Sequence, residues 1–395
     1  MTDEPQLKTQ DSNPLQTVLL EKLRDFSIGT PEDLDYSDMI PGKLDREGFP
    51  VPELVLLLLR NVLRWRWSGK EEKVRWSVYG AVAGEPVIFE LGKFGLKLYR
   101  RHEHRLLTKR ITGQLRAAIK LLERLLRPYI NDRIKQGDVA FENHVSEFMG
   151  RYKYFRKNAG LAYRRAERQP KPRKVKKGEV EEFIADLSLA MNHQSRATTH
   201  GFYNSVAMVD SYFSSVEHRL ILLRAFTGKA FAEGGLQTFL KMSWDEKLNE
   251  ILGPRQPAST GRLIKQLRDI KERIRNPFAH GGYENDKGAL HVHVPGIGFV
   301  PGNLTEFGKS PRFSWVPVEA ADHAEHCRVF DDLDKLLQSN HLAAPHRLMM
   351  AGIDPSFDVE SLQEYLAAVS ADEETLEGFI DHWGYLWERE ANMDY

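Results

Sequence analysis

Apolar residues recur three or four positions apart in two long stretches of the first half of the chain, and this spacing predicts helices. After Arg101 it predicts one helix of about 30 residues, whose apolar stripe consists of Leu107, Ile111, Leu115, Ile119, Leu122, Leu126 and Ile130. A second helix is expected over residues 141–168. Lysine and arginine cover the remaining faces of the first helix and are frequent along the second.

The same spacing predicts further helices in the second half of the chain. The most regular stripe consists of Val206, Val209, Phe213, Val216, Leu220 and Leu223, and a separate short helix is expected before it, over residues 180–191. A third helix is expected over residues 236–252. The fourth covers residues 261–276, with its stripe at Leu263, Leu267, Ile270 and Ile274. A fifth covers residues 319–337, and one or two more are expected near residues 359–369 and 373–390.

Two regions have the β-branched and aromatic composition of strands. Residues 74–82, 87–91 and 96–99 are expected to form two or three strands, after a buried helix over residues 52–67. The stretches "ALHVHV" and "GFVPGNL", followed by "RFSWVPV", predict a small hairpin or β-rich insertion. The expected fold is therefore mainly α, with a helical bundle and a small β insertion in the C-terminal half, preceded by an N-terminal α+β region.

Shifts in composition divide the chain into five segments. Residues 1–50 have mixed polar composition and are expected to be weakly ordered. Residues 51–168 form an α+β region with a basic helical arm, and residues 169–178, within "RQPKPRKVKKGE", form a basic linker. A helical domain over residues 179–340 and an acidic helical tail over residues 353–395 complete the chain.

Cysteine content and the N-terminal sequence favour a cytoplasmic protein. The single cysteine, Cys327, excludes a disulfide framework within one chain and a cysteine-rich zinc site. The N-terminal "MTDEPQLKTQ" is polar and acidic, unlike a signal peptide. The longest apolar run, "LVLLLL", is too short to span a bilayer, so no membrane partner is expected.

The net charge of zero hides a strong asymmetry. Residues 100–177 contain 23 Lys and Arg against 7 Asp and Glu, a net charge of +16. The tail over residues 353–395 contains 12 acidic residues and one basic residue, a net charge of −11. This asymmetry favours an acidic partner such as nucleic acid for the middle of the chain, or a solvated helix that pairs with the chain's own acidic parts.

Aromatic residues alternate with cations in the second predicted helix, a composition that suits RNA because bases stack on aromatic rings. Phe148, Tyr152, Phe155 and Tyr163 are the aromatic candidates, although residues at this spacing also form helix cores. The candidate RNA-binding cations are Arg151, Lys153, Arg156, Lys157, Arg164 and Arg165.

The stretch "RIRNPFAHGG", residues 273–282, ends the fourth predicted helix. At about 100° per residue, Arg275 and His280 flank the outward face of a straight helix, on opposite sides of the apolar stripe. Pro277 interrupts this helix, and Asn276 can cap a short new turn that carries His280. The sequence thus predicts one fixed cation and one titratable base on an outward surface.

An arginine and a histidine together suit metal-independent cleavage of RNA. The histidine takes the proton of the ribose 2′-OH, which attacks the adjacent phosphate. The arginine fork stabilises the charge that develops on the phosphate. A single site lacks an evident acid for the leaving 5′-oxygen, and two copies in a twofold dimer supply it.

The string "RNPFAH" fits the Arg-x4–6-His motif of HEPN domains, including the Asn that often follows the Arg. About residues 179–337 resemble this superfamily of small helical bundles, many of which are metal-independent ribonucleases of toxin, phage-defence and RNA-processing systems. The resemblance implies a homodimer in which Arg275 stabilises the phosphate, His280 is the catalytic base or acid and Asn276 orients them. HEPN domains also use a polar residue of an early helix, for which Asp210 and Glu217 are the candidates.

Two alternatives accompany this interpretation. The Arg and His of "RNPFAH" are also compatible with simple capping of a helix C-terminus. A non-catalytic branch of HEPN-like proteins, such as the mannitol operon repressor-like regulators, carries a similar string and acts as regulators or binding adaptors. The expected partners are RNA, a second copy of the chain, and an activator or antitoxin.

No cofactor or metal is expected. His291 and His293 lie on one face of the predicted strand at a spacing that metal sites use, but no third ligand is evident near them. The glycines of "PGIGFVPG" lack the Lys-Ser/Thr and the following helix of a phosphate-binding loop.

Overall fold

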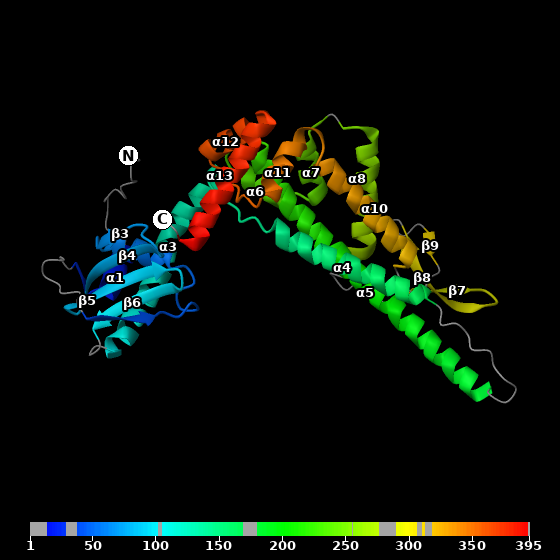
Figure 1. Cartoon of the computed structure of the whole chain (residues 1–395), viewed down its shortest axis with the longest axis horizontal. Helices are drawn as coiled ribbons and strands as arrows, with labels where there is room; N and C mark the ends of the chain where they lie inside the picture. The colour runs from blue at the N-terminus through cyan, green and yellow to red at the C-terminus, as the bar shows by residue number, and fades with distance from the viewer. Residues whose placement is uncertain are drawn as a thin grey trace. The chain divides into compact units, whose positions relative to one another are not determined.

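A computed structural model describes residues 14–28, 38–101, 105–168, 180–254, 256–275, 290–305, 310–312 and 318–393. Within these ranges the protein is mostly helical, with an antiparallel sheet in the N-terminal half, which confirms the expected fold class at this level (Figure 1). The chain divides into unit 1, Met1–Ile134 with Asp381–Tyr395, and unit 2, Lys135–Ile380. A search of the described helices found no candidate for a membrane span.

Unit 1 contains a six-stranded antiparallel sheet with the order β1-β4-β5-β6-β2, and β3 pairs with β4 outside this path. The strands are β1 (Phe26–Ser27), β2 (Met39–Lys43), β3 (Arg66–Ser68), β4 (Val74–Val82), β5 (Glu85–Gly92) and β6 (Gly95–Arg101). Ala83 and Gly84 both have positive φ and connect β4 to β5, as a two-residue hairpin turn requires. The three central strands therefore lie where the sequence predicted them, with longer bounds for β5 and β6.

Helix α3 (Arg105–Gln136) packs its apolar stripe into the core of unit 1. The buried residues of this face are Ile111, Leu115, Ala118 and Leu122, and they join Trp65, Trp76, Val78, Phe89 and Leu98 in one cluster. Ile130, the last residue of the predicted stripe, is instead exposed. Burial of such side chains contributes roughly 1.5–3 kcal/mol each. The 32-residue length of α3 agrees with the helix predicted from this stripe.

Residues 1–50 differ from the expectation of weak order wherever the structure describes them. They include α1 (Pro14–Lys22), β1 and β2, and their side chains at Leu19, Leu23, Leu44 and Phe49 are buried in the same cluster. The prediction of one helix over residues 52–67 was also wrong. That stretch consists of α2 (Glu53–Leu56), the π-helical segment η1 (Leu57–Val62) and β3. These elements depend on pairing and packing with distant residues, which local periodicity does not report.

Unit 2 is built from helices, with a small three-stranded antiparallel sheet. Its helices are α4 (Val145–Glu167), α5 (Val180–Phe226), α6 (Gly235–Lys241), α7 (Trp244–Leu252), α8 (Ala258–Ile270), α10 (Ala320–Leu337), α11 (Ala343–Met350) and α12 (Val359–Ser370), with the 3-10 turn η4 (Asn340–Leu342). Helix α13 (Glu373–Asn392) begins in unit 2 and ends in unit 1. The small sheet, β7 (Leu290–Val294), β8 (Gly298–Thr305) and β9 (Ser310–Arg312), confirms the predicted hairpin.

Helix α5 is one continuous helix of 47 residues, and α4 lies beside it (Figure 1). The expectation of a separate helix over residues 180–191 was wrong. The polar stretch that follows it interrupts the apolar stripe, yet it contains no proline, and the helix continues with exposed side chains at residues 191–196. The basic linker at residues 169–178 lies outside the described residues, and the boundary between the two units falls near the end of α3.

The helix predicted over residues 236–252 is divided into α6 and α7 at Ser243. The backbone N–H of Ser243 donates to the Glu246 carboxylate at 2.7 Å, and the Ser243 hydroxyl donates to the same carboxylate oxygen. A serine followed three residues later by glutamate is the signature of a capping box. The chain therefore starts a new helix at this point, although the apolar spacing continues through it.

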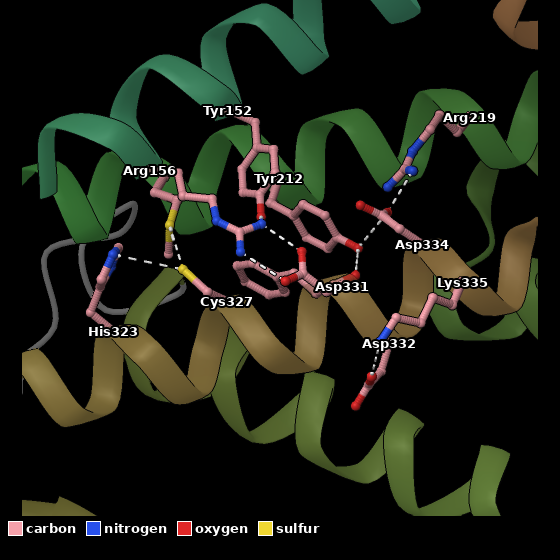
Figure 2. A network of polar contacts seen from close by, with 12 residues as sticks. Tyr152, Arg156, Tyr212, Arg219, His323, Cys327, Asp331, Asp332, Asp334 and Lys335 are labelled. Atoms are coloured by element: carbon pink, nitrogen blue, oxygen red, sulfur yellow. Dashed lines mark hydrogen bonds and ion pairs between the residues drawn. The ribbon is translucent and has the colours of Figure 1, made fainter. Parts of the chain in front are cut away.

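A polar network between α4, α5 and α10 crosses the core of unit 2 (Figure 2). The Arg219 side chain is 2% exposed, and its Nη1 donates to Asp334 Oδ1 at 2.7 Å. The Tyr212 hydroxyl donates to the same oxygen at 2.9 Å, and the Tyr212 ring stacks on Phe330 with centroids 3.9 Å apart. Because a buried charge is tolerated only with a partner, this network fixes how α5 and α10 pack.

Replacement of Asp334 by Ala should destabilise the protein by about 3 kcal/mol, because it leaves the buried guanidinium of Arg219 without this carboxylate. Urea denaturation measures the loss. The matched control is Asp332→Ala, two positions away on α10, since Asp332 pairs only at the surface, with Arg328 and Lys335. The control should change stability by less than about 0.5 kcal/mol. Equal effects of both substitutions would contradict the role given to Asp334.

The buried His323 should make stability depend on pH. Burial, and then the charges of Arg156 and Arg164, lower the pKa of His323 to about 4. In the unfolded chain histidine titrates near pH 6.5, so the unfolded state binds more protons between these values and stability falls as the pH falls through this window. We expect His323 to contribute a loss of about 3 kcal/mol between pH 7 and pH 4. The difference in unfolding free energy between parent and His323→Gln should shrink over this range, and a difference that stays constant from pH 7 to pH 4 would contradict this role of His323.

Candidate functional site

Arg275 lies at the end of a π-helical segment, η3 (Lys271–Arg275), which continues α8 without a break. The buried residues Leu267, Ile270 and Ile274 anchor α8 and η3 to the core. The sequence predicted α geometry throughout this helix, whereas residues 271–275 form a π turn, which holds more residues than an α turn. Segments of this kind often accompany functional sites.

Two carboxylates of α5 face the guanidinium of Arg275. Its Nε lies 3.3 Å from Asp210 Oδ1, and its Nη1 lies 3.9 Å from Glu217 Oε1. Asp210 and Glu217 are seven residues apart and therefore lie on one flank of α5, two turns from each other. The structure thus brings together Arg275 and both of the residues that the sequence offered as its polar support.

A second cation, Lys271, belongs to the same cluster, and sequence reasoning missed it. Its Nζ lies 3.3 Å from Glu217 Oε1 and within 6 Å of the ring centroids of Phe213 and Trp244. The Lys271 side chain is only 16% exposed, and this burial lowers the pKa of its ammonium. The only signal in the sequence is the spacing of four residues between Lys271 and Arg275, which places them on one helix face.

The cluster contains two carboxylates and two cations, so their formal charges cancel. Glu217 lies within 4 Å of both Lys271 and Arg275, and the Asp210 carboxylate pairs with Arg275. A quarter of the Arg275 side chain is exposed to solvent, and a planar guanidinium fork suits an oxyanion. Asn276 and His280, the other predicted members of the site, lie outside the described residues.

The candidate RNA-binding residues of α4 fall into two groups. Arg156 is half-buried and forms a two-pronged ion pair with Asp331, with N–O distances of 2.5 and 2.8 Å, which raises the pKa of its guanidinium (Figure 2). It also donates to the Tyr152 hydroxyl, so its contacts fix α4 to α10. The exposed cations of α4 are Arg151, Lys153, Lys157, Arg164 and Arg165.

The aromatic residues of α4 are mainly helix-core residues, which was the alternative to base stacking. Tyr152 and Tyr163 are buried, and the Tyr163 hydroxyl donates to the Val318 carbonyl oxygen at 2.9 Å. Phe148 and Phe155 are half-buried. The stacking expectation was therefore wrong for the two tyrosines, and the exposed Tyr154, which the sequence did not single out, is the aromatic residue of α4 open to solvent.

His291 and His293 lie on β7 with exposed side chains. No cluster of three or more His, Cys, Asp or Glu side chains suited to a metal ion occurs in the described part of the chain. Cys327 is buried, and burial raises the pKa of its thiol.

Comparison of the chain with protein-family models, curated proteins and solved structures found no match.

The contact between Glu217 and Lys271 can be measured as a coupling free energy. Glu217→Gln leaves the ammonium of Lys271 without its carboxylate partner. Lys271→Met removes that ammonium, so that Glu217 loses this partner. A double-mutant cycle in urea should give a coupling of about 1 kcal/mol between the two residues. The control cycle is Asp332 with Lys335, whose side chain is 76% exposed, and it should give a coupling close to zero. Equal coupling in the two cycles would show that the cluster is not held as described.

Proposed function

We propose that the protein is a metal-independent endoribonuclease that cleaves RNA by attack of the ribose 2′-OH, at an active site shared by two copies of the chain. The resemblance of "RNPFAH" to the HEPN motif suggests the reaction class. The proposal includes an HEPN-like bundle in unit 2, a cytoplasmic homodimer and a role as a toxin or antiviral effector under the control of an activator or antitoxin.

The observation that carries the proposal is the setting of Arg275. Its side chain is partly exposed at the end of η3, and its guanidinium faces two carboxylates of the neighbouring helix α5. A planar cation oriented in this way is suited to the charge that develops on a phosphate in the transition state. It comes five residues before a histidine, and histidine is the side chain whose ordinary pKa lies nearest neutral pH.

The reaction assigns a role to each residue of the motif. The imidazole of His280 accepts the proton of the 2′-OH, and the 2′-oxygen attacks the phosphorus. Arg275 stabilises the charge on the phosphate, and Asn276 orients the two side chains. The bond from phosphorus to the 5′-oxygen breaks. The protonated imidazole of the partner subunit's His280 then donates a proton to that oxygen. The products are a 2′,3′-cyclic phosphate and a free 5′-hydroxyl.

The exposed cations of α4 hold the RNA in this proposal. Arg151, Lys153, Lys157, Arg164 and Arg165 lie on the surface of unit 2, and none of them has an ion pair with a described residue. Phosphate contacts of this type do not read sequence, and their strength falls steeply with salt.

The test is cleavage of mixed RNA in EDTA by the parent and by Arg275→Ala and His280→Ala. The parent should cleave and leave cyclic-phosphate ends, and each variant should lose at least about 100-fold in rate. Arg262→Ala is the matched control, because Arg262 is an exposed arginine of the preceding helix α8. It should keep the parent rate, and purification by the same procedure excludes a contaminating nuclease.

Other outcomes decide between the alternatives. RNA binding without cleavage, unchanged by His280→Ala, would favour a non-catalytic HEPN-like regulator or adaptor. Cleavage that persists in Arg275→Ala would contradict the proposed site. Cleavage that requires a divalent metal would contradict the proposed mechanism.

A further inference from the structure

Helix α3 of unit 1 has a second face that the core does not use. Its apolar stripe is buried against the sheet, and the opposite face is exposed along most of the helix. Five cations lie on this exposed face, namely Lys109, Arg116, Lys120, Arg124 and Arg127. At about 100° and 1.5 Å per residue they fall within an arc of about 80° and extend over about 27 Å.

The charge of this face is almost purely positive. Glu123 is the single acidic residue between positions 109 and 127. Arg116 has a structural contact, since it pairs with Asp45 at 3.5 Å and lies over the Phe49 ring. The side chains of Lys109, Lys120, Arg124 and Arg127 make no ion pair or hydrogen bond with any described residue. Four like charges therefore stand side by side without neutralisation from the described part of the chain.

We propose that this face of α3, Lys109 to Arg127, binds the phosphodiester backbone of a nucleic acid. The site lies in the other unit of the chain from Arg275 and holds whether or not the protein cleaves RNA. It gives unit 1 a function of its own, the capture of nucleic acid without regard to sequence.

The chemistry of the face favours nucleic acid over a protein partner. Stable protein interfaces have an apolar or aromatic centre within a polar rim. No large apolar side chain is exposed on α3 between residues 109 and 127, and the exposed Tyr129 and Ile130 lie beyond the last cation. A regular row of cations on long flexible stems instead suits a partner with regularly spaced negative charges, and binding releases the counterions of that partner.

The test is the salt dependence of binding to a 2′-O-methyl RNA 20-mer, which has no 2′-OH for self-attack. The full-length variant Lys120→Gln/Arg124→Gln/Arg127→Gln removes three neighbouring cations, and glutamine keeps a similar helix propensity. Each lost phosphate contact lowers the slope of log Kd against log salt by about 0.7 for a single strand. The slope should therefore fall by about 2, and binding at 0.1 M salt should weaken by about 10- to 100-fold.

Two control variants distinguish binding at α3 from binding at the cations of unit 2. Lys229→Gln/Lys241→Gln/Arg262→Gln removes the same number of exposed cations from unit 2 and should leave the slope unchanged. Arg151→Gln/Lys153→Gln/Lys157→Gln tests the cations of α4 that belong to the proposed nuclease. An unchanged slope in the α3 variant, with an unchanged thermal melt, would overturn the proposal. A slope that falls only in the α4 variant would also overturn the proposal for α3, but it would leave the proposed nuclease in place.

Discussion

The packing of unit 2 depends on the buried ion pair between Arg219 of α5 and Asp334 of α10. A guanidinium in the core requires a carboxylate partner, so the pairing of Arg219 Nη1 with Asp334 Oδ1 constrains how α5 packs on α10. Glu217 precedes Arg219 by two residues and points to the other side of the same helix, where it meets Arg275 and Lys271. The interaction that fixes α5 inside the bundle therefore also fixes the carboxylates of the candidate site.

The site on the outer side of α5 combines rigidity with access. Lys271 is held against two aromatic rings and Glu217, and Ile274 is buried beside it. Arg275 follows at the end of the π turn, with its guanidinium between carboxylates and solvent. A cation in this position is oriented before any ligand arrives, which is the condition under which a charged group stabilises a transition state effectively.

Local patterns in the sequence predicted much of the fold. The stripes that begin at Leu107 and Val206 predicted α3 and the regular part of α5, because an amphipathic helix records its buried face in its own sequence. Elements that depend on distant partners were missed, including α1 and β2, and the break at Ser243 was missed because a cap outweighed the apolar spacing. The residues of the candidate site were likewise predicted only in part. Asp210 and Glu217 were proposed from the resemblance to HEPN domains. Lys271 was missed because its contacts with Phe213 and Trp244 come from other parts of the chain.

The central claim is that Arg275 presents its guanidinium to a phosphate of RNA. The most direct measurement is a crystal structure of the full chain with a 2′-O-methyl RNA that cannot be cleaved. We expect a backbone phosphate within hydrogen-bond distance of the Arg275 guanidinium, with Asp210 and Glu217 behind it and the motifs of two subunits facing one groove. RNA bound elsewhere, with Arg275 engaged only by its two carboxylates, would contradict it.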